Sequence, residues 1–256
     1  LTLLRRGGRL GEFQQPVNSS DGNLRRPNND WKMINDPGAW GGGHNPEYLV
    51  LGFSKGATQA GIYESGPFED VAFAGMRPRL TEALRAIGAL EMHESVDSKI
   101  ANPDSNIAFG SLIRCSVSRL DKAASVKAGK DVFACTGPLI TKSFSEIPDI
   151  IASCSKQFLT DLPASIKAVF FLGNTDSYVK NCQALIRKLF PADFKQINAM
   201  AVSVNGRVWV NIAHPSRLNG HFNKWLSGND SSGLKRIQAR NALSGSNNSS
   251  GGYLVK

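Results

Sequence analysis

Residues 48–53 read YLVLGF, a short apolar run that ends at a glycine and an aromatic residue and leads into a polar loop. A run this short and this apolar is typical of a strand buried on both faces of a sheet. Three more such runs follow, at residues 107–113 (IAFGSLI), 168–172 (AVFFL) and 208–212 (VWVNI). Between the runs, the apolar spacing predicts helices over residues 79–90, 145–162 and 176–190. This alternation predicts an α/β fold with three αβα layers around a central four-stranded, mostly parallel sheet.

The segments around these runs suggest three parts of the chain. Residues 1–45 are rich in Gly, Asn, Arg and Pro without helical or strand periodicity, which predicts an irregular basic N-terminal arm. Residues 46–240 form the expected α/β domain, and the Ser, Gly and Asn content of residues 241–256 predicts a flexible C-terminal tail. Inside the domain, Asn205-Gly206 between two apolar runs predicts a hairpin that adds an antiparallel strand.

Composition narrows the function classes. The 256 residues carry 30 Lys plus Arg and 21 Asp plus Glu, a net charge of +9, and 41% are hydrophobic. This excludes a disordered, collagen-like or coiled-coil chain, and the basic excess favours a polyanionic partner, with DNA the first candidate. No apolar run approaches the roughly 18–20 residues of a membrane span, and no signal peptide is recognisable. We expect a monomeric cytoplasmic protein that does not bind a membrane.

In a parallel sheet, ligands bind beyond the carboxyl ends of the strands. His214-Pro215-Ser216 directly follows the last apolar run, where an imidazole can donate to a developing oxyanion. Leu218 stands among polar and basic residues and suits a wedge into a base stack. The alternative is that His214 caps a helix and Leu218 packs inward. The loops expected at this edge are GFSKGATQ (52–59), RCSVSR (114–119), GNTDS (173–177) and AHPSRLNGHF (213–222).

Taken together, these loops resemble those of the uracil-DNA glycosylase superfamily. The family pattern recurs in order as LGFSKG, FGSLIRC, FLGNTD and AHPSRL, over roughly residues 47–226. The resemblance implies a glycosylase-like domain that flips a nucleotide out of DNA. It implies that His214 stabilises negative charge on the departing base and that Leu218 fills the gap in the stack. The implied base pocket contains Phe53, Phe73 (with Phe68 as a rival), Ser111 and Asn174, and the implied DNA contacts are Lys55, Arg114, Ser216, Arg217 and Leu218.

The departures from the family pattern concern the reaction and the substrate. Phe53 and Ser54 stand where many members carry an Asp, Asn or Glu, so the candidate catalytic residues are His214, Ser54 and a substitute acid, Asp70. Glu64 and Glu69 are rival acids on the same loop. Ser111 replaces a base-reading Asn and leaves more room. We therefore predict a monofunctional DNA glycosylase for a modified pyrimidine, such as hydroxymethyl- or glucosyl-cytosine of phage DNA, that leaves an abasic site and has a role in phage defence.

Other functions stay open at this point. One is a uracil-DNA glycosylase of ordinary repair, and another is a catalytically silent DNA-binding reader with the same fold. An α/β hydrolase or nucleotide-binding protein has no G-x-S-x-G, H-E-x-x-H or Walker sequence to support it.

Some relatives hold a four-cysteine iron–sulfur cluster. Cys115 and Cys154 match two of its ligands, but the early C-x-x-C is missing. We expect neither this cluster nor any metal or other cofactor.

Overall fold

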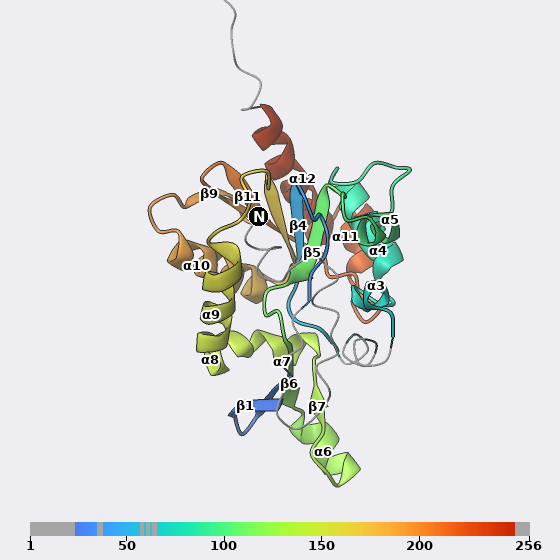
Figure 1. Cartoon of the computed structure of the whole chain (residues 1–256), viewed down its shortest axis with the longest axis vertical. Helices are drawn as coiled ribbons and strands as arrows, with labels where there is room; N and C mark the ends of the chain where they lie inside the picture. Colours follow the sequence, from blue (N-terminus) through green and yellow to red (C-terminus); the bar gives the residue numbers. More distant parts are fainter. Residues whose placement is uncertain (1–23, 35–37, 57–58, 60–61, 63–65, 249–256) are drawn as a thin grey trace, which may run out of the picture.

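A seven-stranded mixed sheet forms the centre of the computed structural model, which describes residues 24–34, 38–56, 59, 62 and 66–248 (Figure 1). The four apolar runs form β4 (Tyr48–Gly52), β5 (Ile107–Ser111), β8 (Ala168–Leu172) and β11 (Arg207–Ile212). These four strands are parallel and adjacent in the order β5-β4-β8-β11. The predicted number of strands is wrong, because antiparallel strands extend both edges. They are β3 (Trp40–Gly41) beside β5, and β10 (Ala201–Val204) and β9 (Lys195–Asn198) beyond β11.

The parallel strands are apolar throughout because both faces of the sheet are covered. On β8, Phe170 packs into the core on one face while Phe171 packs into the core on the other. On β11, Val210 and Trp209 divide between the same two cores. Successive side chains of a strand point to opposite faces, so each face receives every second residue. The three-layer αβα arrangement predicted from these runs is therefore present.

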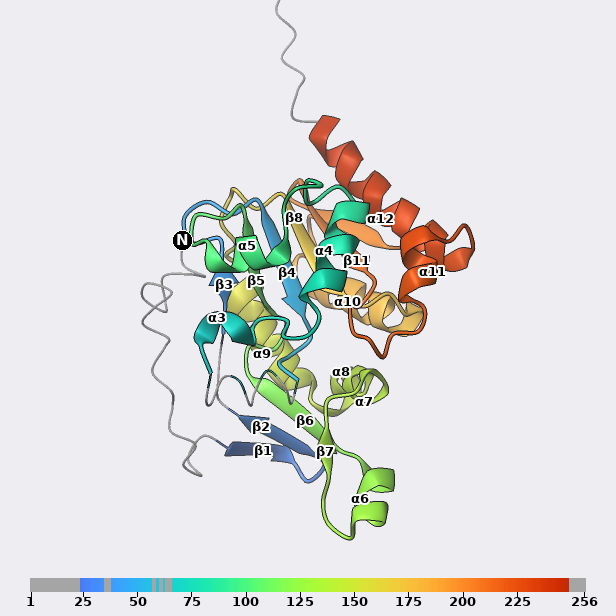
Figure 2. The same cartoon turned by 90° about the vertical axis from the view of Figure 1, so that its right-hand side faces the viewer.

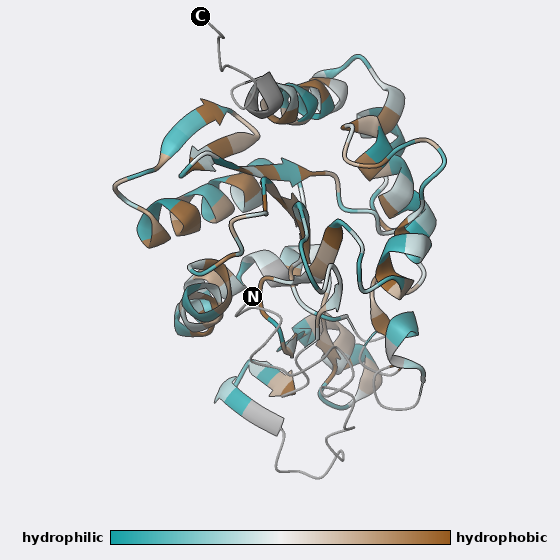
Figure 3. Ribbon diagram, turned by 45° about the horizontal axis from the view of Figure 1, so that its top comes forward, coloured by the Kyte–Doolittle hydropathy of each residue, from teal (hydrophilic) through white to brown (hydrophobic). Residues whose placement is uncertain are grey.

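Helices cover the two faces in separate groups (Figures 1 and 2). One face carries α4, α5, α11 and α12, and the other carries α9 and α10. In Figure 3 the helices show both brown and teal segments, as amphipathic covering helices do. The bounds of these six helices are Arg77–Ala86, Val96–Ala101, Phe222–Ser227, Ser231–Asn248, Pro148–Leu159 and Asp176–Leu189 in the order named. Shorter helices are α3 (Phe68–Val71), α6 (Lys122–Ala128), α7 (Gly137–Thr141) and α8 (Ser143–Glu146).

Two local predictions have clear outcomes. The predicted helix over 145–162 is two helices, α8 and α9, because Ile147 precedes Pro148 and leaves the helical region with φ −134° and ψ 47°. The predicted hairpin is present: β10 and β11 pair antiparallel, with Val204 opposite Arg207. Its two turn residues, Asn205 and Gly206, have φ of +50° and +75°, as a type I′ turn requires.

A second, four-stranded antiparallel sheet corrects two further predictions. Its order is β1-β2-β6-β7, with bounds Leu24–Asn28, Trp31–Ile34, Ser116–Leu120 and Phe133–Ala134. The N-terminal arm is therefore not irregular over β1, β2 and β3. The expected loop 114–119 is a strand from residue 116 onward. In both cases short strands of mixed composition pair with residues far along the chain, for example Trp31 opposite Arg119.

A buried polar network fixes this second sheet to the main domain. Trp31 is 1% exposed, and its indole N–H donates to Glu146 Oε2 at 2.8 Å. Arg119 donates to both oxygens of the same carboxylate, from Nε at 2.7 Å and from Nη2 at 2.9 Å. A bidentate pair of this kind fixes orientation as well as distance. The sheet extends below the carboxyl ends of β4 and β5 in Figures 1 and 2.

The C-terminal boundary also differs from the prediction. Helix α12 continues to residue 248, and Ala239, Ala242 and Leu243 are buried on it. The prediction of a flexible tail is therefore wrong for residues 241–248, and residues 249–256 lie outside the described part. Within the described residues, no helix is both long and apolar enough to cross a bilayer.

Candidate active site

The loops after the four parallel strands gather at one edge of the sheet, the lower edge in Figure 1. The segment after β11 is the most highly structured of them. His214 is half-buried, and its Nδ1 accepts a hydrogen bond from the backbone N–H of Ser216 at 3.1 Å. A ring nitrogen that accepts carries no proton, so the neutral imidazole holds its proton on Nε2.

The charge state of His214 follows from its surroundings. Burial, and secondly the positive charge of Arg79, lowers the pKa of His214 to about 4. The imidazole is therefore neutral at pH 7, and its Nε2–H is a hydrogen-bond donor. A neutral donor of this kind can stabilise an oxyanion that forms in front of it by a hydrogen bond.

Hydrogen bonds within residues 213–222, hereafter the His214 loop, fix its shape. Asn219 donates from Nδ2 to the carbonyl of His214 at 2.8 Å and from its backbone N–H to the carbonyl of Ser216 at 3.0 Å. The hydroxyl of Ser216 accepts from the backbone N–H of Leu218 at 3.2 Å. These bonds close the loop on itself and leave its tip pointing outward.

The tip of the loop carries the predicted DNA contacts. Leu218 is 89% exposed, the largest value among the exposed large apolar side chains of the described residues, and Arg217 beside it is also exposed. The alternative in which Leu218 packs inward is therefore wrong. The exposed leucine is free to contact another molecule, and its contact with DNA stays a prediction.

The loop after β4 contributes Ser54. Ser54 Oγ is buried and has no hydrogen-bond partner among the described residues. Gln59 ties this loop to α3, since its side chain accepts from the backbone N–H of Gly56 at 3.2 Å and donates to the carbonyl of Val71 at 3.1 Å.

Gly52, Phe73 and Ser111 lie together at the ends of β4 and β5. A Cβ added to Gly52 would lie 3.5 Å from Cε1 of Phe73 and 3.9 Å from Oγ of Ser111. Phe73 is buried and has φ +53°, which a bulky residue rarely adopts. A strained backbone of this kind costs about 1–3 kcal/mol and clusters at functional sites. Two predicted pocket residues are thus brought together, while their contact with a base stays a prediction.

The structure separates Phe53 from Phe73. Phe53 packs against Phe144 and Tyr178, with ring centroids 6.0 and 6.4 Å away, in the core on the opposite face of the sheet. The prediction that Phe53 lines the base pocket is therefore wrong, because its side chain points to the opposite face of the sheet from Phe73. Phe68 begins α3, and its side chain lies outside what is described.

Asn174 and Asp70, two further predicted site residues, have no observed contact with the residues described above. Asn174 is half-buried, and its carbonyl accepts from Lys235 Nζ at 2.9 Å. Asp70 is exposed on α3, and its carboxylate makes no hydrogen bond or ion pair with a described residue. Glu69 is exposed beside it, while Glu64 lies outside the described residues. The acid role of Asp70 stays a prediction.

Two of the predicted DNA contacts are buried. Lys55 is 1% exposed, and its ammonium donates to the carbonyl of Arg114 at 2.7 Å. Arg114 is 5% exposed; its Nη1 donates to the carbonyl of Gly38 at 3.3 Å, and burial lowers the pKa of its guanidinium to about 10. The prediction that they grip phosphates is wrong, because neither side chain reaches the surface.

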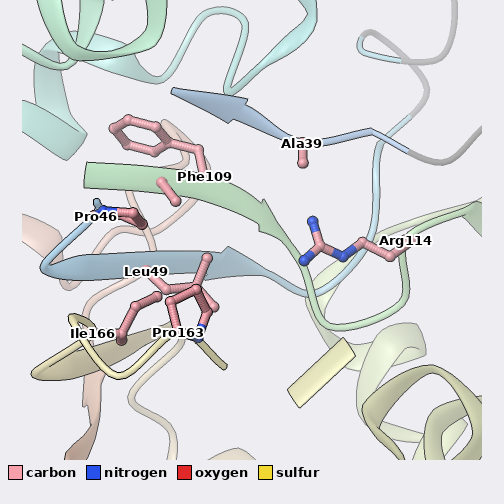
Figure 4. Close-up of a pocket in the computed structure, with 8 residues that line it drawn as sticks. Ala39, Pro46, Leu49, Phe109, Arg114, Pro163 and Ile166 are labelled. Carbon is pink, nitrogen blue, oxygen red and sulfur yellow. The ribbon is translucent and has the colours of Figure 1, made fainter. Parts of the chain in front are cut away.

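Arg114 lines a small cavity together with Leu49, Phe109, Pro163 and Ile166 (Figure 4). No residue of the His214 loop lines this cavity. It lies behind the candidate site rather than within it, so it offers no place for the base to bind.

Sequence reasoning missed the side chain that braces the His214 loop from outside. Arg79 on α4 donates from Nη1 to the carbonyl of Ser216 at 2.5 Å and from Nη2 to the carbonyl of Asn219 at 3.2 Å. Its guanidinium also lies 4.1 Å from the centre of the Phe222 ring. Nothing in the helical pattern around Arg79 marks it, because its partners lie 137 and 140 residues away.

The four cysteines do not gather in one place in the described structure. Across the described ranges, which include all four cysteines, no three His, Cys, Asp or Glu side chains form a group that could hold a metal. Cys182 lies in the core on α10, and burial raises its pKa to about 12. Cys135 is held by a hydrogen bond to the carbonyl of Val117 at 2.8 Å.

Comparison with known proteins gives structural likenesses but no match in sequence. No family model matches the chain, and no curated protein matches it. The crystal structure of wild-type Pedobacter heparinus SMUG2 is similar over 80% of this chain and 77% of that chain, at 15% identity and a TM-score of 0.37. A likeness at this level supports no conclusion about family or function.

Proposed function

We propose that this protein is a monofunctional DNA glycosylase that flips a nucleotide out of the stack and hydrolyses its N-glycosidic bond. The observation that carries the proposal is the His214 loop. Within five residues it combines a neutral imidazole donor with a leucine that is 89% exposed, on a backbone closed by its own hydrogen bonds. The two features serve the two steps that such an enzyme needs: cleavage of the bond and extrusion of the base.

The chemistry that we propose for His214 follows from its tautomer. When the bond between C1′ and the base nitrogen breaks, its electron pair goes to the base and the sugar becomes cationic. Nε2–H of His214 donates to the carbonyl oxygen on which the negative charge collects. A water molecule then adds its oxygen to C1′ and loses a proton, which leaves an abasic site and the free base. Ser54 Oγ, which has no partner among the described residues, is a candidate to hold that water, and the Asp70 carboxylate is the general base that accepts the proton.

The proposed substrate is a modified pyrimidine, with hydroxymethyl- or glucosyl-cytosine of phage DNA as the leading examples. Small residues, Gly52 and Ser111, stand where β4 and β5 end, and a Cβ on Gly56 would meet no described residue within 4 Å. A serine hydroxyl makes fewer hydrogen bonds than an amide, so it discriminates less strictly between pyrimidine faces. Removal of such bases from invading DNA is the basis for a role in phage defence.

The test is base release from a panel of DNAs. One set of duplexes contains uracil, a second hydroxymethylcytosine and a third glucosylated hydroxymethylcytosine; each is incubated with the protein, treated with alkali and examined for strand breaks. His214→Ala should abolish release while DNA binding persists. His93→Ala is the matched control, because His93 is exposed on the segment before α5. Release that is equal in wild type and His214→Ala would overturn the assigned chemistry.

The silent reader remains the second candidate, since the leading substitute for the missing carboxylate, Asp70, is exposed and its side chain has no partner among the described residues. Binding to one modified DNA with no alkali-labile strand would establish the reader. If the protein neither binds any of these DNAs nor makes any of them alkali-labile, both proposals fail. Breaks confined to uracil would establish the ordinary repair activity instead.

A further inference from the structure

Arg79 is the one charged side chain of the described residues that holds the His214 loop from a different element. Its two terminal nitrogens donate to carbonyls at two points of the loop, Ser216 and Asn219, while its plane lies over the Phe222 ring. A planar guanidinium can make such a fork and stack at the same time, whereas an ammonium cannot. Residues 214–219 are thereby tied to α4, which packs on the sheet.

The charge of Arg79 is not neutralised where it lies. Both polar partners given above are neutral carbonyl oxygens, and no ion pair joins Arg79 to a carboxylate within the described residues. The positive charge therefore acts on whatever lies at the loop. It disfavours a second positive charge on His214, and it favours a negative charge in front of His214.

We propose that Arg79 is a positioning residue for the reaction proposed above: it fixes the turn that aims His214 and supplies the positive field in which the departing base becomes an anion. This inference rests on the proposed function for its catalytic meaning. The geometric part stands on the two hydrogen bonds and the ring contact alone. Of the other titratable groups on the loop, α11 and α4, Arg217, His221, Lys224 and Glu82 are exposed, so water screens them. Arg77 and Arg85 on α4 are half-buried, but Arg77 donates to the carboxylate of Asp97 and Arg85 to the carbonyl of Glu94.

Arg85 offers a matched control on the same helix. It also donates twice to a backbone carbonyl, that of Glu94, from Nε at 3.2 Å and from Nη2 at 2.6 Å, and it is half-buried like Arg79. Replacement of either arginine removes a pair of hydrogen bonds between α4 and a backbone carbonyl elsewhere. Only the replacement of Arg79 removes hydrogen bonds to the His214 loop.

The experiment compares the full-length wild type with Arg79→Met, Arg79→Lys and Arg85→Met. The imidazole of His214 is titrated by NMR, and single-turnover base release is measured across the same pH range on the substrate that the panel identifies. In Arg79→Met the His214 titration should move from about pH 4 toward the ordinary value, and the acid limb of the rate should move with it. Release at neutral pH should fall about 10- to 100-fold. Arg79→Lys should keep the titration, because its charge remains, but should lose rate, because the fork is gone.

The outcomes separate this inference from the proposed function. If Arg79→Met and Arg85→Met titrate and react alike, Arg79 only stabilises the fold and the inference fails. If the wild type releases no base but the titration shifts in Arg79→Met alone, the positioning of His214 stands and the proposed function fails. A shift in both variants points to loosening of α4 as a whole and overturns the assignment to Arg79.

Discussion

Shortening Leu218 to alanine separates a contact with DNA from a contact with the fold. Full burial of a leucine side chain contributes about 1.5–3 kcal/mol, and Leu218 is 89% exposed, so roughly a tenth of that is at stake in folding. We expect the free energy of unfolding to change by about 0.2–0.3 kcal/mol. Opening a base stack costs a few kcal/mol, of which a wedge offsets a part. Excision from duplex DNA should therefore fall about 10- to 100-fold, which is roughly 1.4–2.7 kcal/mol.

The assay measures single-turnover release from a duplex and from the matching single strand, with urea unfolding alongside. Leu234→Ala is the control, because Leu234 is 55% exposed on α12 and is not part of the His214 loop. A single strand needs less unstacking, so its excision should change little in Leu218→Ala. Equal losses on both substrates would refute the wedge. A loss of several kcal/mol in unfolding would show instead that Leu218 packs against the protein.

Three further predictions concern stability. Folding lowers the pKa of His214, so the unfolded chain binds the proton more readily than the folded chain. The contribution of the neutral His214 to stability is fully present above about pH 6.5 and declines as the pH falls toward 4. The loss is about 3 kcal/mol, at roughly 1.4 kcal/mol per pH unit. Urea unfolding against pH should show this loss in wild type and not in His214→Asn. Trp31→Ala should cost about 3–5 kcal/mol, because a buried indole leaves a cavity and Glu146 loses a donor; a cost under about 1 kcal/mol in urea would contradict the anchoring of the second sheet. Gly173→Ala should cost about 1–3 kcal/mol, because the new Cβ would lie 2.6 Å from the ring of Tyr178. Gly137→Ala, where a Cβ meets no described residue within 4 Å, is the control, and equal melting temperatures would refute the overlap.

The parallel strands of the main sheet were predictable because each is specified by its own residues. Runs such as residues 168–172 are apolar at every position, and Asn205-Gly206 is a sequence typical of a type I′ turn. The strands of the second sheet carry no such local signal. Trp31–Ile34 is a short, mixed stretch whose pairing with β6 depends on residues over 80 positions away. Long-range pairing of short strands of mixed composition leaves little pattern in a single sequence.

The candidate site was predictable in its loops and not in the directions of its side chains. His214 and Leu218 follow a strand within a few residues, so their placement at the sheet edge comes with the strand itself. Lys55 and Arg114 also follow strands, yet both turn inward to bond backbone carbonyls. A basic residue in a loop is usually solvated, and that general tendency misled here. Arg79 was invisible because a partly exposed arginine on an amphipathic helix is ordinary in every respect except its distant partners.

The two edges of the main sheet bear on how copies of this protein meet. β3 is two residues long, and Gly41 and Gly42 turn the chain away at φ of +61° and +56°. At the other edge, pairing of β9 with β10 is interrupted by an irregularity between Ala201 and Val202, and Asn198 Nδ2 donates to the carbonyl of Gln238 on α12 at 2.9 Å. A strand from another molecule needs a long, flat row of free backbone groups to pair with. Over the described residues, neither edge of the main sheet offers such a row, so the main sheet gives a second copy of this protein little to pair with.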